Sequence, residues 1–169
     1  GKKFYGPSTL RKGIEKSRNL MTVRIAQNLG FEKISKVSKK LGVYENVPEL
    51  LSVSLGSNET TLLKLTNAYC IFVNGGKKVK PVLINRIQDR RGKTIFNSDK
   101  RSCEGCKIVN VNDDSNFTPK IINNFEQVIS RETAYQMTSM LEGVITRGTG
   151  KKLRSLKVPL VGKTGTTNN

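Results

Sequence analysis

Near its end the chain reads Val158-Pro159-Leu160-Val161-Gly162-Lys163-Thr164-Gly165-Thr166-Thr167. The first four residues form a short apolar run, which predicts a buried strand. A cation then lies between two glycines, and a hydroxyl lies on each side of the second glycine. Along a strand, Lys163 and Gly165 would face one way and the neighbouring threonines the other. Small residues let an extended peptide approach a strand edge, and Lys and Thr side chains can bind a carboxylate. The stretch therefore predicts a site for an acidic peptide end.

Two other interpretations of the same residues stay open. Gly162-Lys163-Thr164 matches the end of a phosphate-binding loop, but that motif needs glycine at the position of Lys157 and a helix after the Lys-Thr pair. A nucleotide phosphate site is therefore disfavoured. The remaining interpretation is an ordinary core strand that ends in a polar turn, and a short motif cannot exclude it.

The composition is strongly basic, with 30 Lys and Arg against 13 Asp and Glu and a net charge of +17. This balance is compatible with a polyanion partner, either nucleic acid or an acidic polymer at a cell surface. The basic residues are scattered, however, which favours lysines spread over solvated faces. A chain of 169 residues with regularly spaced apolar positions predicts one domain with its own core.

The chain contains no histidine. This excludes Ser-His-Asp and Cys-His catalysis and His-containing metal sites, and we expect no metal and no cofactor. Acid–base catalysis near neutral pH would require a lysine or a carboxylate with a shifted pKa. No stretch is apolar for long enough to span a bilayer and no signal peptide heads the chain, so we expect any anchor to lie outside this sequence.

Five segments combine a helical spacing of apolar residues with cap or stop residues. They cover residues 9–16, 19–30 with Asn19 as the N-cap, 31–42, a segment from Thr60 or Thr61 to Gly75, and 130–148 with Ser130 as the N-cap. Residues 79–88 and 94–96 flank Asp89-Arg90-Arg91-Gly92, which indicates a β-hairpin. Residues 97–124 are polar without a period and predict a long loop, and residues 149–157 predict a basic linker.

The cysteines are Cys70, on a predicted helix, and Cys103 and Cys106 in the polar segment. A zinc knuckle would need a second pair of ligands, and a thioredoxin-like site would need a preceding strand and a following helix. A local disulfide in an oxidising compartment and two unreacted thiols both remain open. The paired spacing favours the disulfide.

Ser17-Arg18-Asn19 is the only Ser-x-Asn in the chain. By itself the pattern is typical of an N-cap. Together with Lys163-Thr164-Gly165, it resembles the transpeptidase domain of bifunctional (class A) penicillin-binding proteins, which carry Ser-x-x-Lys, Ser-x-Asn and Lys-Thr-Gly motifs. The segments that resemble the family, in the same order, are 9–11 with 17–20, 51–56, 67–69 and 72–76, 80–84 with 86–87, 134–141, 143–144, 147–150 and 162–168.

The resemblance implies an α+β fold of the β-lactamase/transpeptidase type. A helical subdomain would accompany part of a mostly antiparallel sheet that carries Lys163, and the fold would be truncated at both ends. We expect residues 1–169 to be a single incomplete domain with a variable loop insertion at about 97–129.

The resemblance also implies the chemistry of the parent protein, a D,D-transpeptidase of cell-wall synthesis. A serine attacks the penultimate D-alanine carbonyl of a peptidoglycan stem peptide, D-alanine leaves, and a neighbouring amine takes the acyl group. β-Lactams such as penicillins would acylate the same serine. The parent would be anchored in the membrane and face the bacterial periplasm, and it would carry a separate glycosyltransferase domain.

By motif, Ser17 would relay a proton towards the leaving nitrogen, and Asn19 would hydrogen-bond the substrate amide and the activating lysine. Lys163 would supply fixed positive charge near the substrate carboxylate.

The substrate-binding residues implied by the same motif are Thr164, Gly165 and Thr166. The two hydroxyls would surround the carboxylate of the peptide. Gly165 would let the substrate run alongside as an added strand.

One departure from the family pattern has a functional consequence. No serine of the chain has a lysine three positions later, so the nucleophile motif is missing. We expect an internal fragment that is inactive alone. The alternative function is a non-catalytic basic module that binds nucleic acid, although only 6% of the residues are aromatic.

Overall fold

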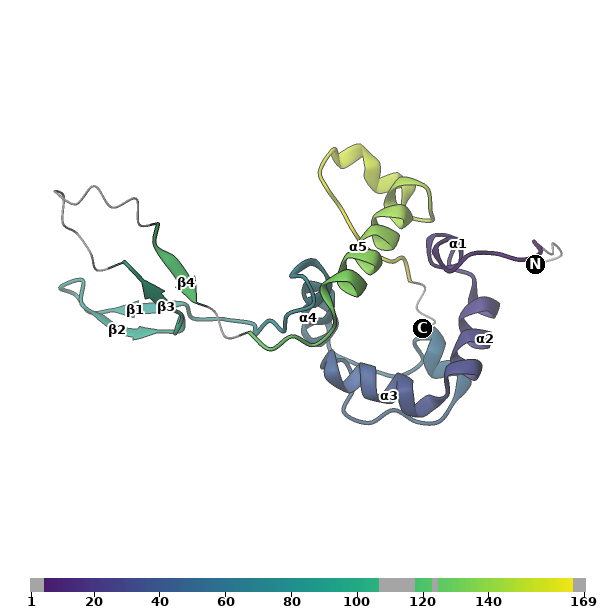
Figure 1. The fold of residues 1–169 in the computed structure, drawn as a ribbon, viewed down its shortest axis with the longest axis horizontal. Helices are drawn as coiled ribbons and strands as arrows, with labels where there is room; N and C mark the ends of the chain where they lie inside the picture. Colours follow the sequence, from purple (N-terminus) through teal and green to yellow (C-terminus); the bar gives the residue numbers. More distant parts are fainter. Residues whose placement is uncertain (1–4, 107–117, 123–124, 166–169) are drawn as a thin grey trace. The chain divides into compact units, whose positions relative to one another are not determined.

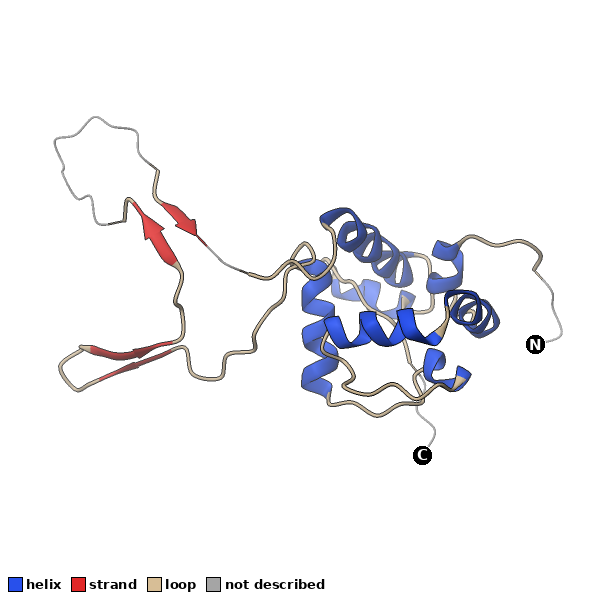
Figure 2. Cartoon of the chain, turned by 60° about the horizontal axis from the view of Figure 1, so that its bottom comes forward, coloured by secondary structure: helices blue, strands red, loops and turns tan. Residues whose placement is uncertain are grey.

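The computed structural model describes residues 5–106, 118–122 and 125–165 of the chain (Figure 1). The chain divides into two compact units, which we call unit 1 (residues 1–79 and 127–169) and unit 2 (residues 80–126). Within the described ranges, the helices belong to unit 1 and the two antiparallel sheets to unit 2 (Figure 2). The α+β class is thereby confirmed. The prediction of one incomplete domain over residues 1–169 stays a prediction.

Three short helices open unit 1: α1 (Leu10–Glu15), α2 (Asn19–Leu29) and α3 (Phe31–Lys40). Their positions agree with the predicted ranges. The prediction that Asn19 is an N-cap is wrong, because Asn19 is the first helical residue and Arg18 holds the cap position. No side chain caps α2. The preceding turn ends α1 and places Ser17 before the cap position and Asn19 after it, so neither side chain caps α2.

The remaining helices of unit 1 are η1 (Leu51–Leu55, 3-10), α4 (Leu62–Val73), α5 (Arg131–Thr146) and η2 (Lys151–Leu156, 3-10). The Thr61 hydroxyl caps α4 by accepting the Lys64 N–H at 3.2 Å. Ser130 caps α5 in the same way, at 3.2 Å, as its position predicts. The predicted basic linker after α5 is wrong in part, because most of it forms η2. Isolated 3-10 turns have no apolar period that would reveal them.

Helix α5 is the centre of unit 1. Its buried hydrophobic side chains follow a helical spacing, and they are Ala134, Leu141, Val144 and Ile145. It packs against α1, α4 and η2. On α4, Ile71 is fully buried. The end of α5 is therefore held in place from several directions.

Unit 2 consists of two hairpins. Strand β1 (Arg86–Gln88) pairs with β2 (Thr94–Asn97), and β3 (Ser102–Glu104) pairs with β4 (Lys120–Ile122). The first hairpin is confirmed, although its first strand begins at residue 86 rather than 79. The loop predicted over 97–124 is wrong where β3 and β4 form, since three-residue strands are too short to show an alternating pattern. Cys103 and Cys106 are joined by a disulfide with a Cα–Cα distance of 5.6 Å, as their spacing favours.

The predicted buried strand at residues 158–161 is wrong, and no described strand contains Lys163. Val158 is 57% exposed. The Gly162 N–H donates to the carbonyl oxygen of Leu141 on α5 at 3.4 Å. A strand needs a ladder of hydrogen bonds to a partner, whereas a helix offers this segment one carbonyl. The segment that leads into Lys163 therefore contacts α5 at Gly162 and belongs to no described sheet.

Among the described residues, no helix has the length and apolar character needed to cross a membrane.

Candidate functional site

Ser17 and Lys163 meet in the folded chain although 146 positions separate them. The Lys163 amine donates a hydrogen bond from Nζ to Ser17 Oγ at 2.8 Å. The same amine donates to the Thr164 carbonyl oxygen at 2.8 Å. Both side chains remain accessible to solvent. The two motifs chosen from the sequence thus contribute to one site.

The turn between α1 and α2 presents Ser17. The Ser17 N–H donates to the Ile14 carbonyl oxygen at 3.1 Å, and the Arg18 N–H donates to the Gly13 carbonyl oxygen at 2.9 Å. This pair of bonds is a Schellman motif that closes α1. Ser17 has a φ of 51°, a left-handed conformation in which glycine is usual at this position. Strained backbone of this kind occurs preferentially at functional sites, where the surrounding contacts hold it in place.

Asn19 lies one residue into α2 and is exposed. Its side chain makes no hydrogen bond to any residue that the structure describes, and it is not used as a cap. Next to it, the Arg18 guanidinium lies 3.5 Å from the centre of the Tyr5 ring in a cation–π contact. The structure therefore places Asn19 beside Ser17 in the chain, but it brings only Ser17 to Lys163.

Burial lowers the pKa of the Lys163 amine below the ordinary lysine value, because protein atoms replace part of its hydration. The side chain is still partly exposed. A partly desolvated ammonium interacts more strongly with an anion than one in bulk water. The site can thus attract a carboxylate and polarise the Ser17 hydroxyl.

Thr164, Gly165 and Thr166 were predicted to bind substrate. The Thr164 hydroxyl lies 2.6 Å from the Thr149 hydroxyl. A Cβ added at Gly165 would meet no described atom within 4 Å, which leaves open space beside the chain there. Thr166 lies outside the described residues.

Sequence reasoning missed an ion pair that anchors the site. Glu15, the last residue of α1, is buried, and its carboxylate accepts a hydrogen bond from Arg147 at 2.6 Å. This contact raises the pKa of the Arg147 guanidinium. A side chain at Gly143 would collide with the Glu15 carboxylate. Gly143, inside the predicted helix, was the one signal in the sequence, but a glycine does not show which distant residue packs against it.

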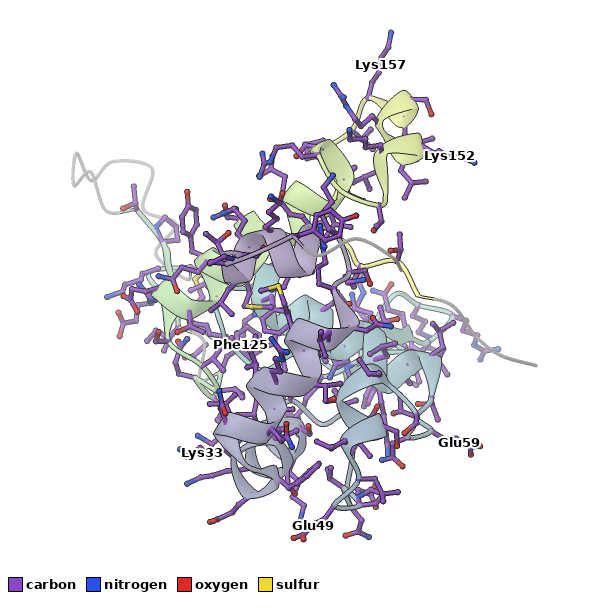
Figure 3. All side chains as sticks on the ribbon, turned by 90° about the vertical axis from the view of Figure 1, so that its right-hand side faces the viewer. Lys33, Glu49, Glu59, Phe125, Lys152 and Lys157 are labelled. Atoms are coloured by element: carbon purple, nitrogen blue, oxygen red, sulfur yellow. A yellow bond between two sulfur atoms is a disulfide. The ribbon has the colours of Figure 1, made fainter. Side chains whose placement is uncertain are left out.

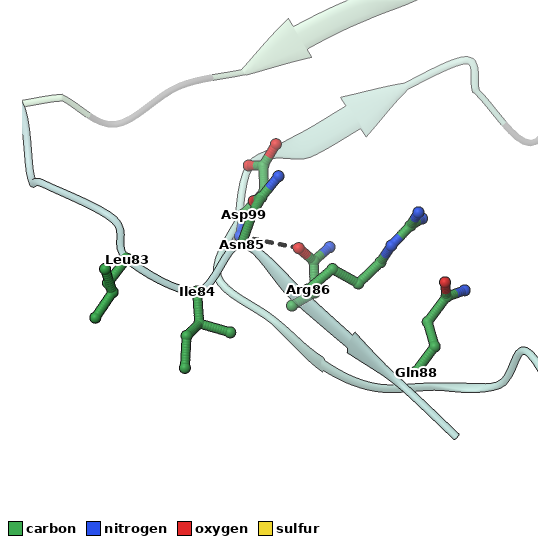
Figure 4. Close-up of a pocket in the computed structure, with 7 residues that line it drawn as sticks. Leu83, Ile84, Asn85, Arg86, Gln88 and Asp99 are labelled. Atoms are coloured by element: carbon green, nitrogen blue, oxygen red, sulfur yellow. Dashed lines mark hydrogen bonds between the residues drawn. The ribbon is translucent and has the colours of Figure 1, made fainter. Parts of the chain in front are cut away.

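A hollow of about 740 Å³ lies in unit 2 (Figure 4). Its lining residues are Leu83, Ile84, Asn85, Arg86, Gln88, Asn97 and Asp99. The Asp99 N–H donates to Asn97 Oδ1 at 3.1 Å across its wall. None of the predicted site residues lines it. The described residues also contain no group of three His, Cys, Asp or Glu side chains that could hold a metal ion.

The family model for the penicillin binding protein transpeptidase domain matches residues 2–169. The chain belongs to this family.

The penicillin-binding transpeptidase sequence is 43% identical to penicillin-binding protein 1A of Rickettsia bellii over 167 residues. That alignment covers 99% of this chain and 21% of the relative. Penicillin-binding protein 1A of Pseudomonas aeruginosa is 33% identical over 198 residues, which cover 98% of this chain and 24% of the relative. The chain thus spans about a fifth of the length of these relatives.

Solved penicillin-binding proteins share the fold. Penicillin-binding protein 1A of Haemophilus influenzae superposes with a TM-score of 0.77 at 25% identity over 98% of this chain and 27% of that chain. The D,D-transpeptidase domain of an Eggerthella lenta peptidoglycan glycosyltransferase superposes with a TM-score of 0.69 at 19% identity. The match covers 99% of this chain and 44% of that chain. The second likeness supports the fold alone. The β-lactamase/transpeptidase-like architecture predicted from the motifs is confirmed.

Proposed function

We propose that this chain forms part of a D,D-transpeptidase that cross-links peptidoglycan stem peptides through an acyl-serine intermediate. The observation that carries the proposal is the 2.8 Å hydrogen bond from Lys163 to Ser17, which joins the Ser-x-Asn and Lys-Thr-Gly motifs. Membership of the penicillin-binding transpeptidase family supports the reaction class. The nucleophile belongs to a Ser-x-x-Lys motif, which this sequence does not contain.

Ser17, Asn19 and Lys163 are proposed as the residues that assist acylation. Because Lys163 donates to Ser17 Oγ, the Ser17 hydroxyl hydrogen is directed elsewhere and can be given to the leaving nitrogen. The fixed charge of Lys163 favours a neutral amine on the activating lysine of the nucleophile motif. Asn19, whose amide is not used by the helix cap, can hydrogen-bond the substrate amide.

The carboxylate of the stem peptide, or of a β-lactam, is proposed to bind beside Lys163 and the hydroxyls of Thr164 and Thr166. Charge-assisted hydrogen bonds of this kind are stronger than neutral ones. The open space at Gly165 supports passage of an extended peptide along the segment. We propose no metal and no cofactor, since acyl transfer to serine requires neither.

The whole protein is proposed to be anchored in the bacterial inner membrane and to act at its periplasmic face. Its relatives in Rickettsia and Pseudomonas are penicillin-binding proteins 1A about five times as long as this chain, and this length supports further domains. A disulfide at Cys103–Cys106 agrees with an oxidising compartment.

The test is acylation of the complete protein by a fluorescent penicillin. Lys163→Ala is expected to lower the rate constant about 10²-fold, because it removes a preorganised charge from the site. Lys152→Ala is the matched control, since Lys152 extends from η2 into solvent (Figure 3). Labelling that is unchanged in Lys163→Ala contradicts the proposal.

The nucleic-acid alternative predicts a different result. Labelled single- and double-stranded DNA would bind the chain with an affinity that falls steeply with salt. Lys33 of α3 and Lys157 after η2 extend outward from different elements, which supports scattered rather than clustered basic residues (Figure 3).

A further inference from the structure

Thr149 occupies a junction that the motifs did not single out. Its backbone N–H donates to the Glu15 carbonyl oxygen at 3.0 Å. Its hydroxyl lies 2.6 Å from the Thr164 hydroxyl. Thr164 is next to Lys163, which bonds Ser17, and Ser17 follows Glu15 by two residues. Two covalent segments and three hydrogen bonds thus form a closed ring through the site.

The glycines on either side of Thr149 explain how the ring closes. A Cβ at Gly148 would collide with the Glu15 carbonyl oxygen, so only glycine lets the chain after α5 approach the end of α1 this closely. A Cβ at Gly150 would lie 2.9 Å from the Ile145 side chain. The Lys16 amine also donates to the Arg147 carbonyl oxygen at 2.7 Å. Thr149 is held by its backbone while its side chain points to Thr164.

The two hydroxyls share one hydrogen bond, and its direction matters. If Thr164 donates to Thr149, its hydrogen is occupied and cannot bind an anion. If Thr149 donates, the Thr164 hydrogen is free. A carboxylate that accepts from Thr164 polarises that hydroxyl and makes its oxygen a better acceptor, which favours donation by Thr149.

We propose that Thr149 is a positioning residue, which donates its hydroxyl hydrogen to Thr164 and thereby leaves the Thr164 O–H to bind the carboxylate of the peptide substrate or β-lactam. This role rests on the proposed transpeptidase function. Thr149 acts through Thr164 and touches no reacting atom. Its backbone bond to Glu15 fixes the distance between the Lys-Thr-Gly stretch and the turn that carries Ser17.

The test uses the complete protein and two ligands, a penicillin and the same penicillin with its carboxylate converted to a methyl amide. Acylation is followed over a range of concentrations, which separates the dissociation constant of the initial complex from the acylation rate constant. Thr149→Val is expected to weaken binding of the penicillin about threefold, because the Thr164 O–H loses the donor that orients and polarises it towards the carboxylate. Binding of the amide is expected to change less than twofold.

Three further variants test this interpretation. Thr149→Ser keeps the donor and is expected to retain wild-type binding of the penicillin. Thr146→Val is the matched control, because the Thr146 hydroxyl donates to the Glu142 carbonyl oxygen within α5 at 3.1 Å and lies outside the ring. If Thr149→Val fails to fold, Thr149→Cys replaces it, since a thiol is a weak donor and the same loss is expected.

The possible results separate this inference from the function on which it rests. If the wild type is not acylated, the transpeptidase assignment fails. If the wild type is acylated and Lys163→Ala is slow, but Thr149→Val binds penicillin normally, the role of Thr149 is wrong while the function stands. An equal loss for the penicillin and its amide would show that Thr149 only supports the fold, which also overturns the proposal.

Discussion

At the scale of single residues, Ser17 combines an unfavourable backbone with a useful side chain. Its φ of 51° places it where a Cβ is strained, and the Schellman bonds at the end of α1 hold it there. The conformation directs its hydroxyl to the Lys163 amine at 2.8 Å. Glycine would suit the turn better but would remove the hydroxyl.

Ser17→Gly is accordingly expected to be more stable than Ser17→Ala by about 1 kcal/mol. Both variants lose the hydrogen bond from Lys163, but only glycine relieves the strain, which is roughly 1–2 kcal/mol less an entropic cost of about 0.5–1 kcal/mol. Urea unfolding of the two variants measures the difference. Equal stabilities would mean that the backbone of Ser17 is not strained.

The Lys163 amine predicts a pH dependence of stability. Its pKa is lowered in the folded state, so between that value and the ordinary lysine pKa the unfolded chain binds more protons. Stability is therefore expected to rise with pH through this window and to level off above the ordinary value. Urea unfolding from pH 7 to 11 should show this rise in the wild type and lose it in Lys163→Met. A rise of the same size in Lys163→Met would assign it to other groups.

At the scale of elements, the contact between α1 and α5 decides where the two motifs lie. Glu15 ends α1, Arg147 follows α5, and the 2.6 Å ion pair between them is reinforced by close packing at Gly143 and Gly148. Burying a carboxylate is costly unless it is paired. The pair therefore specifies how the two helices approach each other more than it stabilises the chain.

Arg147→Met is expected to lower the midpoint of urea unfolding, because it leaves the Glu15 carboxylate buried and unpaired. The loss is expected to be smaller than for a fully buried pair, since Arg147 stays in contact with solvent. Glu15→Gln combined with Arg147→Met should recover part of the loss, as a double-mutant cycle measures. Arg154→Met on exposed η2 is the control. Additive effects at the two positions would contradict the coupling.

At the scale of the whole molecule, this sequence supplies the proposed assisting residues but no nucleophile motif. Lys163, Ser17 and Asn19 lie in unit 1, but no Ser-x-x-Lys motif occurs in the sequence. Positioned charge and hydrogen-bond donors cannot form an acyl-enzyme without a residue to acylate.

The 169-residue chain alone is therefore expected to form no covalent adduct with penicillin. Intact-mass spectrometry after incubation should show the unmodified mass, whereas the complete protein should gain one penicillin. Acetylation of surface lysines by an unrelated reagent serves as the control for detection. An adduct on the isolated chain would mean that another residue acts as the nucleophile.

Local signals in the sequence were sufficient for much of the helical unit. The caps at Thr60 or Thr61 and at Ser130 predicted where two helices begin, because capping depends on residues a few positions apart, although the cap predicted at Asn19 was wrong. The Asp89–Gly92 turn predicted the first hairpin for the same reason. The strands β3 and β4 were missed, since three residues are too few to show an alternation of apolar and polar side chains.

The sequence alone determined the family, the approximate ranges of the five α-helices and the identity of Ser17 and Lys163 as candidates, because motifs and caps depend on residues a few positions apart. Only the tertiary structure decided that Glu15 is buried against Arg147, that Lys163 reaches Ser17, that residues 158–161 form no strand, and that Thr149 closes the ring. These features depend on which segments pack together. Contacts between residues more than a hundred positions apart cannot be inferred from the helix or strand propensity of either segment.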